Sequence, residues 1–160
     1  MKKQKLAILI LFLLYVISLL KLTVFRQNVY YSERQLNLTL FSDLIRIYRN
    51  GSLRFFLRMF LGNIGWFVPF GMLVPPLLKR ENLAKTAGLG MLFSLAIETM
   101  QFIFRKGVAE LDDVILNTTG AIIGYGLYKL LRYWWTSVKN KTTRRNKRRA
   151  DVSQQTNSEL

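Results

Sequence analysis

The sequence contains no cysteine and no histidine among its 160 residues. The absence of cysteine excludes disulfides, thiolate metal sites and a cysteine nucleophile. The absence of histidine removes the most common general base, the most common transition-metal ligand and any Ser-His-Asp triad. Protein classes whose chemistry depends on these two side chains are therefore excluded.

Acidic residues are also scarce, since 9 Asp and Glu stand against 24 Lys and Arg, which gives a net charge of +15. Hydrophobic residues nevertheless make up 51% of the chain. A chain that is rich in both apolar and charged residues is unusual unless the two kinds lie in separate segments. In this sequence they do lie in separate segments. The length fits a single domain.

Four long apolar runs dominate the chain and cover residues 6–25, 55–78, 86–104 and 114–131. Each is long enough to cross a hydrocarbon core of about 30 Å as a helix. Too little polar chain remains to cover four core helices of a soluble protein. The first run has the basic flank of a signal peptide, but only bulky residues follow it, which favours a retained anchor. The sequence therefore predicts an all-α integral membrane protein, with a four-helix bundle over residues 1–138.

Two segments outside the apolar runs carry predictions of their own. Thr39–Asn50 has apolar residues at helical spacing, which predicts a short helix lying in the membrane interface or packed on the bundle. Residues 139–160 are polar and basic, which predicts a disordered cytoplasmic tail. Beside a membrane, such a tail is attracted to anionic lipid, and no nucleic-acid partner is expected.

Lys and Arg in the flanks of the runs predict the orientation. In a four-span protein both termini and the loop 79–85 lie on one side, and these segments carry most of the basic residues. The positive-inside rule therefore places both termini in the cytoplasm and the protein in the cell membrane. The first outer loop is more basic than this rule favours.

Three polar side chains from three different runs are expected at a similar depth. Counting 1.5 Å per residue from the outer surface, Asn63, Glu98 and Asn117 lie about 12, 9 and 6 Å inward. Polar groups at such depths face a bundle interior or a wet cavity. The sequence thus predicts a polar intramembrane pocket in the outer leaflet.

Helical spacing extends this pocket. Gln101 shares a helix face with Glu98, and Asp112 and Asp113 precede the last run beside Glu110. A GxxxG pair at Gly120 and Gly124 allows a close helix contact below it. The predicted ligand-binding residues are Asn63, Glu98, Gln101, Asp112, Asp113 and Asn117.

A purely structural interpretation of these residues stays open. The amides of Asn63, Gln101 and Asn117 are suited to joining helices by hydrogen bonds. An intramembrane carboxylate such as Glu98 is a functional candidate, although it could instead be neutral or paired with a basic neighbour such as Arg105.

The motifs that carry these residues resemble the VanZ-like membrane family over about residues 36–131. They are NLTLF from Asn37, N-x-x-x-F-x-P-x-G from Asn63, S-x-x-x-E-x-x-Q from Ser94 and E-L-D-D-x-x-x-N-x-x-G from Glu110. The resemblance implies a cell-surface function in bacteria with a Gram-positive-type envelope. It also implies lowered susceptibility to teicoplanin and related lipoglycopeptides.

Three functions are compatible with this resemblance. The first is a resistance factor that binds an amphiphile, such as a lipoglycopeptide antibiotic, among the membrane lipids. The second is an intramembrane enzyme acting on a lipid-linked envelope precursor, with Glu98 as acid or base. The third, a small transporter subunit, is disfavoured because four helices are few and no inverted repeat is visible.

No metal and no cofactor are expected. Asp112 and Asp113 could hold Mg²⁺ through oxygen ligands, but adjacent carboxylates in a loop more often serve solubility.

Overall fold

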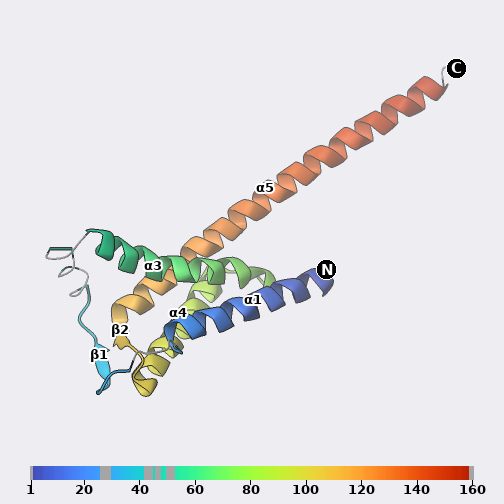
Figure 1. Cartoon of the computed structure of the whole chain (residues 1–160). Helices are drawn as coiled ribbons and strands as arrows, with labels where there is room; N and C mark the ends of the chain where they lie inside the picture. The colour runs from blue at the N-terminus through green and yellow to red at the C-terminus, as the bar shows by residue number, and fades with distance from the viewer. Residues whose placement is uncertain (1, 26–29, 42–44, 46–47, 50–52, 159–160) are drawn as a thin grey trace. The chain divides into compact units, whose positions relative to one another are not determined.

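The computed structural model of the chain describes residues 2–25, 30–41, 45, 48–49 and 53–158. Within these residues, four helices are long and apolar enough to cross a membrane, which confirms the predicted fold class. The elements follow in the order α1 (Lys2–Thr23), β1 (Gln35–Asn37), α3 (Leu53–Leu73), η1 (Pro75–Leu77), α4 (Leu83–Phe104), β2 (Val108–Glu110) and α5 (Leu111–Ser158) (Figure 1).

Local sequence explains where the spanning helices end. α3 continues through Pro69 and stops at Leu73, just before a Pro-Pro pair that starts the 3₁₀ turn η1. Proline is tolerated inside a spanning helix because neighbouring groups satisfy the freed backbone carbonyl. α4 begins after Asn82, whose side-chain oxygen accepts a hydrogen bond from the Ala84 amide at 2.7 Å.

The last helix is longer than the sequence predicts. α5 runs to Ser158, so the structure has helix where the composition of residues 139–160 predicts disorder. Residues 127–160 contain no glycine and no proline, and their many Lys and Arg residues are good helix formers. Half of the predicted interfacial helix, Thr39–Asn50, lies outside the described residues.

The chain divides into two units, Met1–Gly126 and Leu127–Leu160. The second unit carries the exposed aromatic residues Tyr133, Trp134 and Trp135. Such a group of amphipathic rings is typical of the membrane–water interface.

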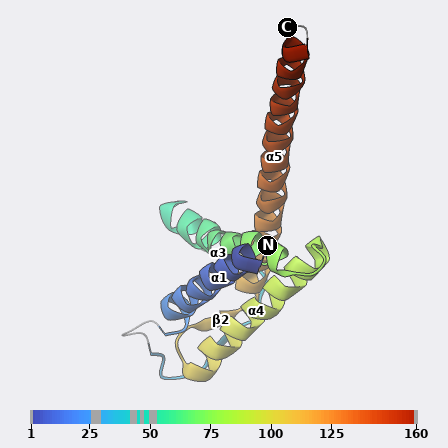
Figure 2. The same cartoon turned by 90° about the vertical axis from the view of Figure 1, so that its right-hand side faces the viewer.

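Within the first unit, α1 packs beside α3 and α4 (Figure 2). The Tyr15 hydroxyl of α1 donates to the Trp66 carbonyl of α3 at 2.7 Å. The rings of Phe25 and Phe104 lie 6.2 Å apart, so the end of α1 meets the end of α4. α1 and α4 therefore run in the same direction, as a four-span topology requires.

A two-stranded parallel sheet links the segment after α1 to the segment after α4. Gln35, Leu36 and Asn37 of β1 pair with Val108, Ala109 and Glu110 of β2. We call the end of the bundle that carries this sheet the sheet end. The opposite end, where η1 precedes the start of α4, is called the η1 end. The sheet is absent from the sequence prediction because three-residue strands are too short to show alternation.

The aromatic part of the apolar core lies toward the η1 end. Phe70 packs against Phe12, Phe67 and Phe93 with ring centroids 5.4–5.7 Å apart. Dispersion between such closely packed rings replaces the hydrophobic effect, which is weak between helices in lipid.

Glycines bring α3 and α5 into backbone contact. A Cβ atom built on Gly120 would overlap the carbonyl oxygen of Ile64, and one on Gly124 would overlap that of Val68. The GxxxG pair therefore allows the close contact that its spacing predicts. Gly62 and Gly65 of α3 take no part in this contact, because nothing lies within 4 Å of a Cβ atom built on either residue.

Candidate functional site

A polar cavity of about 350 Å³ lies at the sheet end of the bundle, and we call it the polar chamber. Residues from α1, α3, α4, β2 and α5 line it, so every spanning helix contributes to its wall. Five of the six predicted ligand-binding residues are among them, namely Asn63, Glu98, Gln101, Asp113 and Asn117. The helical depths estimated from sequence and the lining of the chamber thus describe the same level of the bundle.

Two of these residues join α5 to its neighbours. The Asn63 side-chain amide of α3 donates a hydrogen bond to the Asp113 carboxylate of α5. The Asn117 amide donates to the Ser94 hydroxyl of α4 at 2.9 Å, and both of these side chains are buried. Each pair satisfies polar groups that would be costly in a low-dielectric interior.

Glu98 lies between α4 and the sheet. Its side chain is only 6% exposed, and its Oε2 accepts a hydrogen bond from the backbone N–H of Glu110 at 3.0 Å. The sequence left open whether Glu98 is neutral or paired with a basic neighbour, and the structure gives it a backbone partner. Arg105, one such candidate, instead donates to the Ser32 carbonyl at 3.1 Å.

Gln101 connects the chamber to α1. Its Nε2 lies 3.5 Å from the Thr23 carbonyl oxygen near the end of that helix. Lys106 also lines the chamber and contributes its basic side chain. The sequence named Lys106 as one possible basic partner of Glu98, and both residues line the chamber. It did not place Thr23 in the site, because only tertiary packing brings Thr23 there.

Asp112 does not belong to the polar chamber. Both of its carboxylate oxygens lie 2.9 Å from the backbone N of Phe41, and its side chain is 3% exposed. Phe41 has a φ of 56°, a left-handed conformation that costs free energy in a bulky residue. The Asp112 carboxylate therefore holds the turn after β1 against the start of α5.

The neighbouring carboxylates of Asp112 and Asp113 consequently serve different partners. Successive residues in a helix point about 100° apart, so one faces Phe41 and the other faces Asn63. Within the described part of the chain, no group of three acidic residues is arranged to hold a metal ion.

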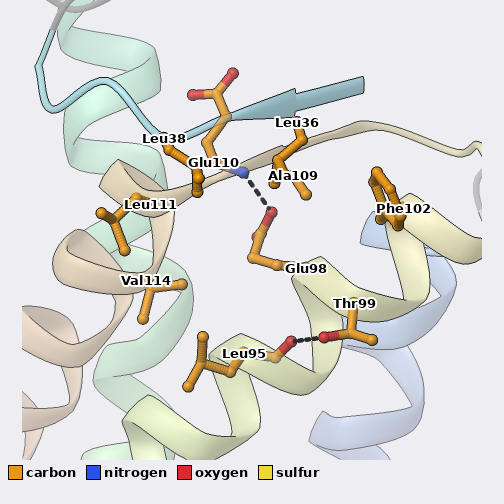
Figure 3. A pocket seen from close by; sticks show the side chains of 10 residues that line it. All are labelled: Leu36, Leu38, Leu95, Glu98, Thr99, Phe102, Ala109, Glu110, Leu111 and Val114. Atoms are coloured by element: carbon orange, nitrogen blue, oxygen red, sulfur yellow. Dashed lines mark hydrogen bonds between the residues drawn. The ribbon is translucent and has the colours of Figure 1, made fainter. Parts of the chain in front are cut away.

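A second cavity of about 220 Å³ adjoins the chamber, and we call it the apolar cavity (Figure 3). Glu98 and Glu110 line both spaces. The rest of its wall is apolar apart from Thr99, and consists of Leu36, Leu38, Leu95, Phe102, Ala109, Leu111 and Val114. Leu36 and Ala109 reach it through the sheet, which is why the sequence alone does not reveal it.

The site therefore combines hydrogen-bonding side chains with an adjacent apolar recess. Carboxyl and amide oxygens in the polar chamber can accept hydrogen bonds from hydroxyl or amino groups of a ligand. This composition, a few polar groups beside apolar walls, is typical of small-molecule sites.

Comparisons with known proteins identify a family for the chain. A model of the VanZ/LLP1 family matches residues 12–132. The chain is 32% identical to Protein VanZ of Enterococcus faecium over an alignment of 123 residues, and the match covers 73% of this chain and 70% of that protein. No solved structure matches the chain significantly.

Proposed function

Because the chain belongs to the VanZ/LLP1 family of membrane proteins, we propose that it is a bacterial resistance factor against teicoplanin and related lipoglycopeptides. It lowers susceptibility by binding an amphiphile in the outer leaflet of the cell membrane. The polar chamber is the binding site, with Asn63, Glu98 and Asp113 as its central contacts.

One observation carries this proposal: polar side chains from α3, α4 and α5 converge on a single chamber inside a membrane-spanning bundle. Placing polar residues at such a depth in the membrane costs free energy. Joining helices by hydrogen bonds does not require the polar residues to enclose a cavity, so this arrangement supports a binding role. The hydrogen bonds of Asn63 and Asn117 hold the chamber walls in place, and the cavity between them leaves room for a ligand group.

The proposed orientation places both termini in the cytoplasm and the sheet end at the outer surface. Lys3 and Lys5 lie in the first turn of α1, Lys79 and Arg80 follow η1, and Lys85 lies in the first turn of α4. This distribution supports the assignment by the positive-inside rule. The chamber then faces the leaflet in which a lipoglycopeptide inserts.

A susceptibility assay tests the proposal directly. The wild-type chain, expressed in a sensitive Gram-positive host, should raise the teicoplanin concentration needed to stop growth and leave that of vancomycin nearly unchanged. Glu98→Gln and Asn63→Ala should each abolish this protection at unchanged membrane abundance. Thr119→Ala is the matched control, because the Thr119 hydroxyl only bonds the Ile115 carbonyl of its own helix. Equal susceptibility with and without the wild-type chain would refute the proposal.

An enzymatic alternative is supported by the two carboxyl groups of Glu98 and Asp113 in the same chamber. In this alternative Glu98 transfers a proton during a reaction on a lipid-linked envelope precursor. Mass spectrometry of envelope lipids separates the two functions. A lipid species that changes with the wild-type chain but not with Glu98→Gln supports catalysis, and identical lipid profiles support binding alone.

A further inference from the structure

The apolar cavity and the polar chamber meet at Glu98 and Glu110, which line both. We propose that the two spaces form one bipartite site, in which the apolar cavity holds an alkyl chain and the polar chamber holds the amine-bearing head of the same amphiphile. This inference rests on the proposed function for the location of the site and adds the chemistry of its ligand.

The few polar groups in the wall of the apolar cavity have hydrogen-bond partners within the protein. The Thr99 hydroxyl donates to the Leu95 carbonyl of its own helix at 2.7 Å. Glu98 directs Oε2 to the Glu110 backbone N–H, as Figure 3 shows. The Thr99 hydroxyl, Glu98 Oε2 and the Glu110 N–H are therefore already hydrogen-bonded, and the cavity favours a ligand part that makes no hydrogen bonds.

The apolar cavity is large enough for one chain of a ligand but too small for a whole ligand. Its volume of about 220 Å³ is below the roughly 300 Å³ at which ordinary small-molecule pockets begin. A single alkyl chain fits such a space, and the polar chamber of about 350 Å³ accepts the head to which the chain is attached.

Three of the leucines that line the apolar cavity are also exposed at the protein surface. Leu36 is 58% exposed, Leu38 is 63% exposed and Leu95 is 41% exposed. Exposed leucines on a membrane-embedded protein contact lipid, so an alkyl chain already dissolved in the bilayer can slide between them without crossing water.

The composition of the polar chamber identifies the head. Three acidic residues, Glu98, Glu110 and Asp113, line it together with one basic residue, Lys106. An ammonium group has three donors and no acceptor, and it complements an excess of carboxyl oxygens. A head that carries a carboxylate or phosphate would meet this excess of like groups and is disfavoured.

Photolabelling of the full chain in phospholipid nanodiscs tests the inference. The probe is a long-chain alkylamine with a diazirine near its methyl end, and the comparison probes are the alcohol and the carboxylate of the same chain length. After irradiation, mass spectrometry locates the label. The amine should label segments that contain Leu36, Leu95 or Phe102 in preference to other lipid-facing segments.

Two variants separate a site from general partition into lipid. Leu95→Trp fills the apolar cavity and should lower this labelling roughly tenfold, as expected for a poorly fitting group in an apolar pocket. Leu92→Trp is the matched control, because Leu92 lies on the same helix, is 61% exposed and does not line the cavity. Asp113→Asn keeps an acceptor for Asn63 and should reduce the preference for amine over alcohol.

The outcomes distinguish this inference from the proposed function. Uniform labelling of lipid-facing segments, or equal labelling in Leu95→Trp and Leu92→Trp, overturns the alkyl-chain site. Equal or stronger labelling by the carboxylate probe overturns the amine preference. Cavity labelling in a protein that gives no protection against teicoplanin overturns the proposed function and leaves the site standing.

Discussion

The two ends of the bundle are held together by different interactions. At the η1 end, Phe70 packs among other aromatic rings, and Gly71 brings its backbone against the Ala121 carbonyl. At the sheet end, hydrogen bonds such as those of Asn63 with Asp113 and Ser94 with Asn117 join the helices around a cavity.

This difference shows how a small membrane protein can keep a hollow polar site. Helices in lipid gain little from the hydrophobic effect and depend on close packing. The η1 end provides that packing, so the sheet end can retain a cavity and polar groups that cost stability. Stability is thus expected to depend mainly on the η1 end, and binding on the sheet end.

The largest effect is expected where the packed end has no free space. Gly124→Val places a Cβ onto the Val68 carbonyl and should lower the free energy of unfolding by about 3 kcal/mol. Gly126→Val is the control, because nothing lies within 4 Å of a Cβ at Gly126. Equilibrium unfolding in mixed micelles measures both, and equal stability of the two variants would contradict the close contact.

The next effect concerns Glu98 as the support of the sheet. Glu98→Leu leaves the Glu110 backbone N–H without its acceptor and should cost about 2 kcal/mol of unfolding free energy. Glu98→Gln keeps a side-chain acceptor and should cost less. Hydrogen exchange at the Glu110 amide reports the same contact, and equal protection in all three proteins would show that Glu98 does not hold β2.

A smaller effect is expected for the buried pair that joins α4 and α5. Ser94→Ala and Asn117→Leu each remove one partner of a hydrogen bond. In a double-mutant cycle, the two substitutions should be coupled by about 1 kcal/mol, the scale measured for hydrogen bonds within membranes. Additive effects on unfolding would instead indicate that these side chains act independently.

The smallest effect is expected between α1 and α3. Tyr15→Phe removes one hydroxyl donor to the Trp66 carbonyl and should cost roughly 0.5 kcal/mol. Thermal unfolding should show this small loss relative to Tyr133→Phe, where the side chain is exposed. A loss as large as that of Gly124→Val would mean that α1 matters more to the packing than the comparison of the two ends implies.

Hydropathy and helical geometry were sufficient to predict the spans and their polar level. A continuous apolar run predicts a spanning helix without tertiary information, and a fixed rise per residue places Asn63, Glu98 and Asn117 at comparable depths. These three residues line the same chamber in the structure.

Contacts between distant segments could not be predicted in this way. β1 and β2 lie far apart in sequence and are too short for a recognisable pattern. The apolar cavity depends on this pairing, because Leu36 and Ala109 line it. The sequence also grouped Asp112 with Asp113, since helical phase at the first residues of α5 depends on where the helix begins.

The parallel pairing of β1 with β2 also constrains the order in which the protein can fold during synthesis. A ribosome delivers the first span and the segment of Gln35 long before Val108 exists. The segment after α1 therefore remains without its strand partner until α4 has been made. The chamber cannot be complete before the start of α5 has been made, because Asp113 and Asn117 form part of its wall.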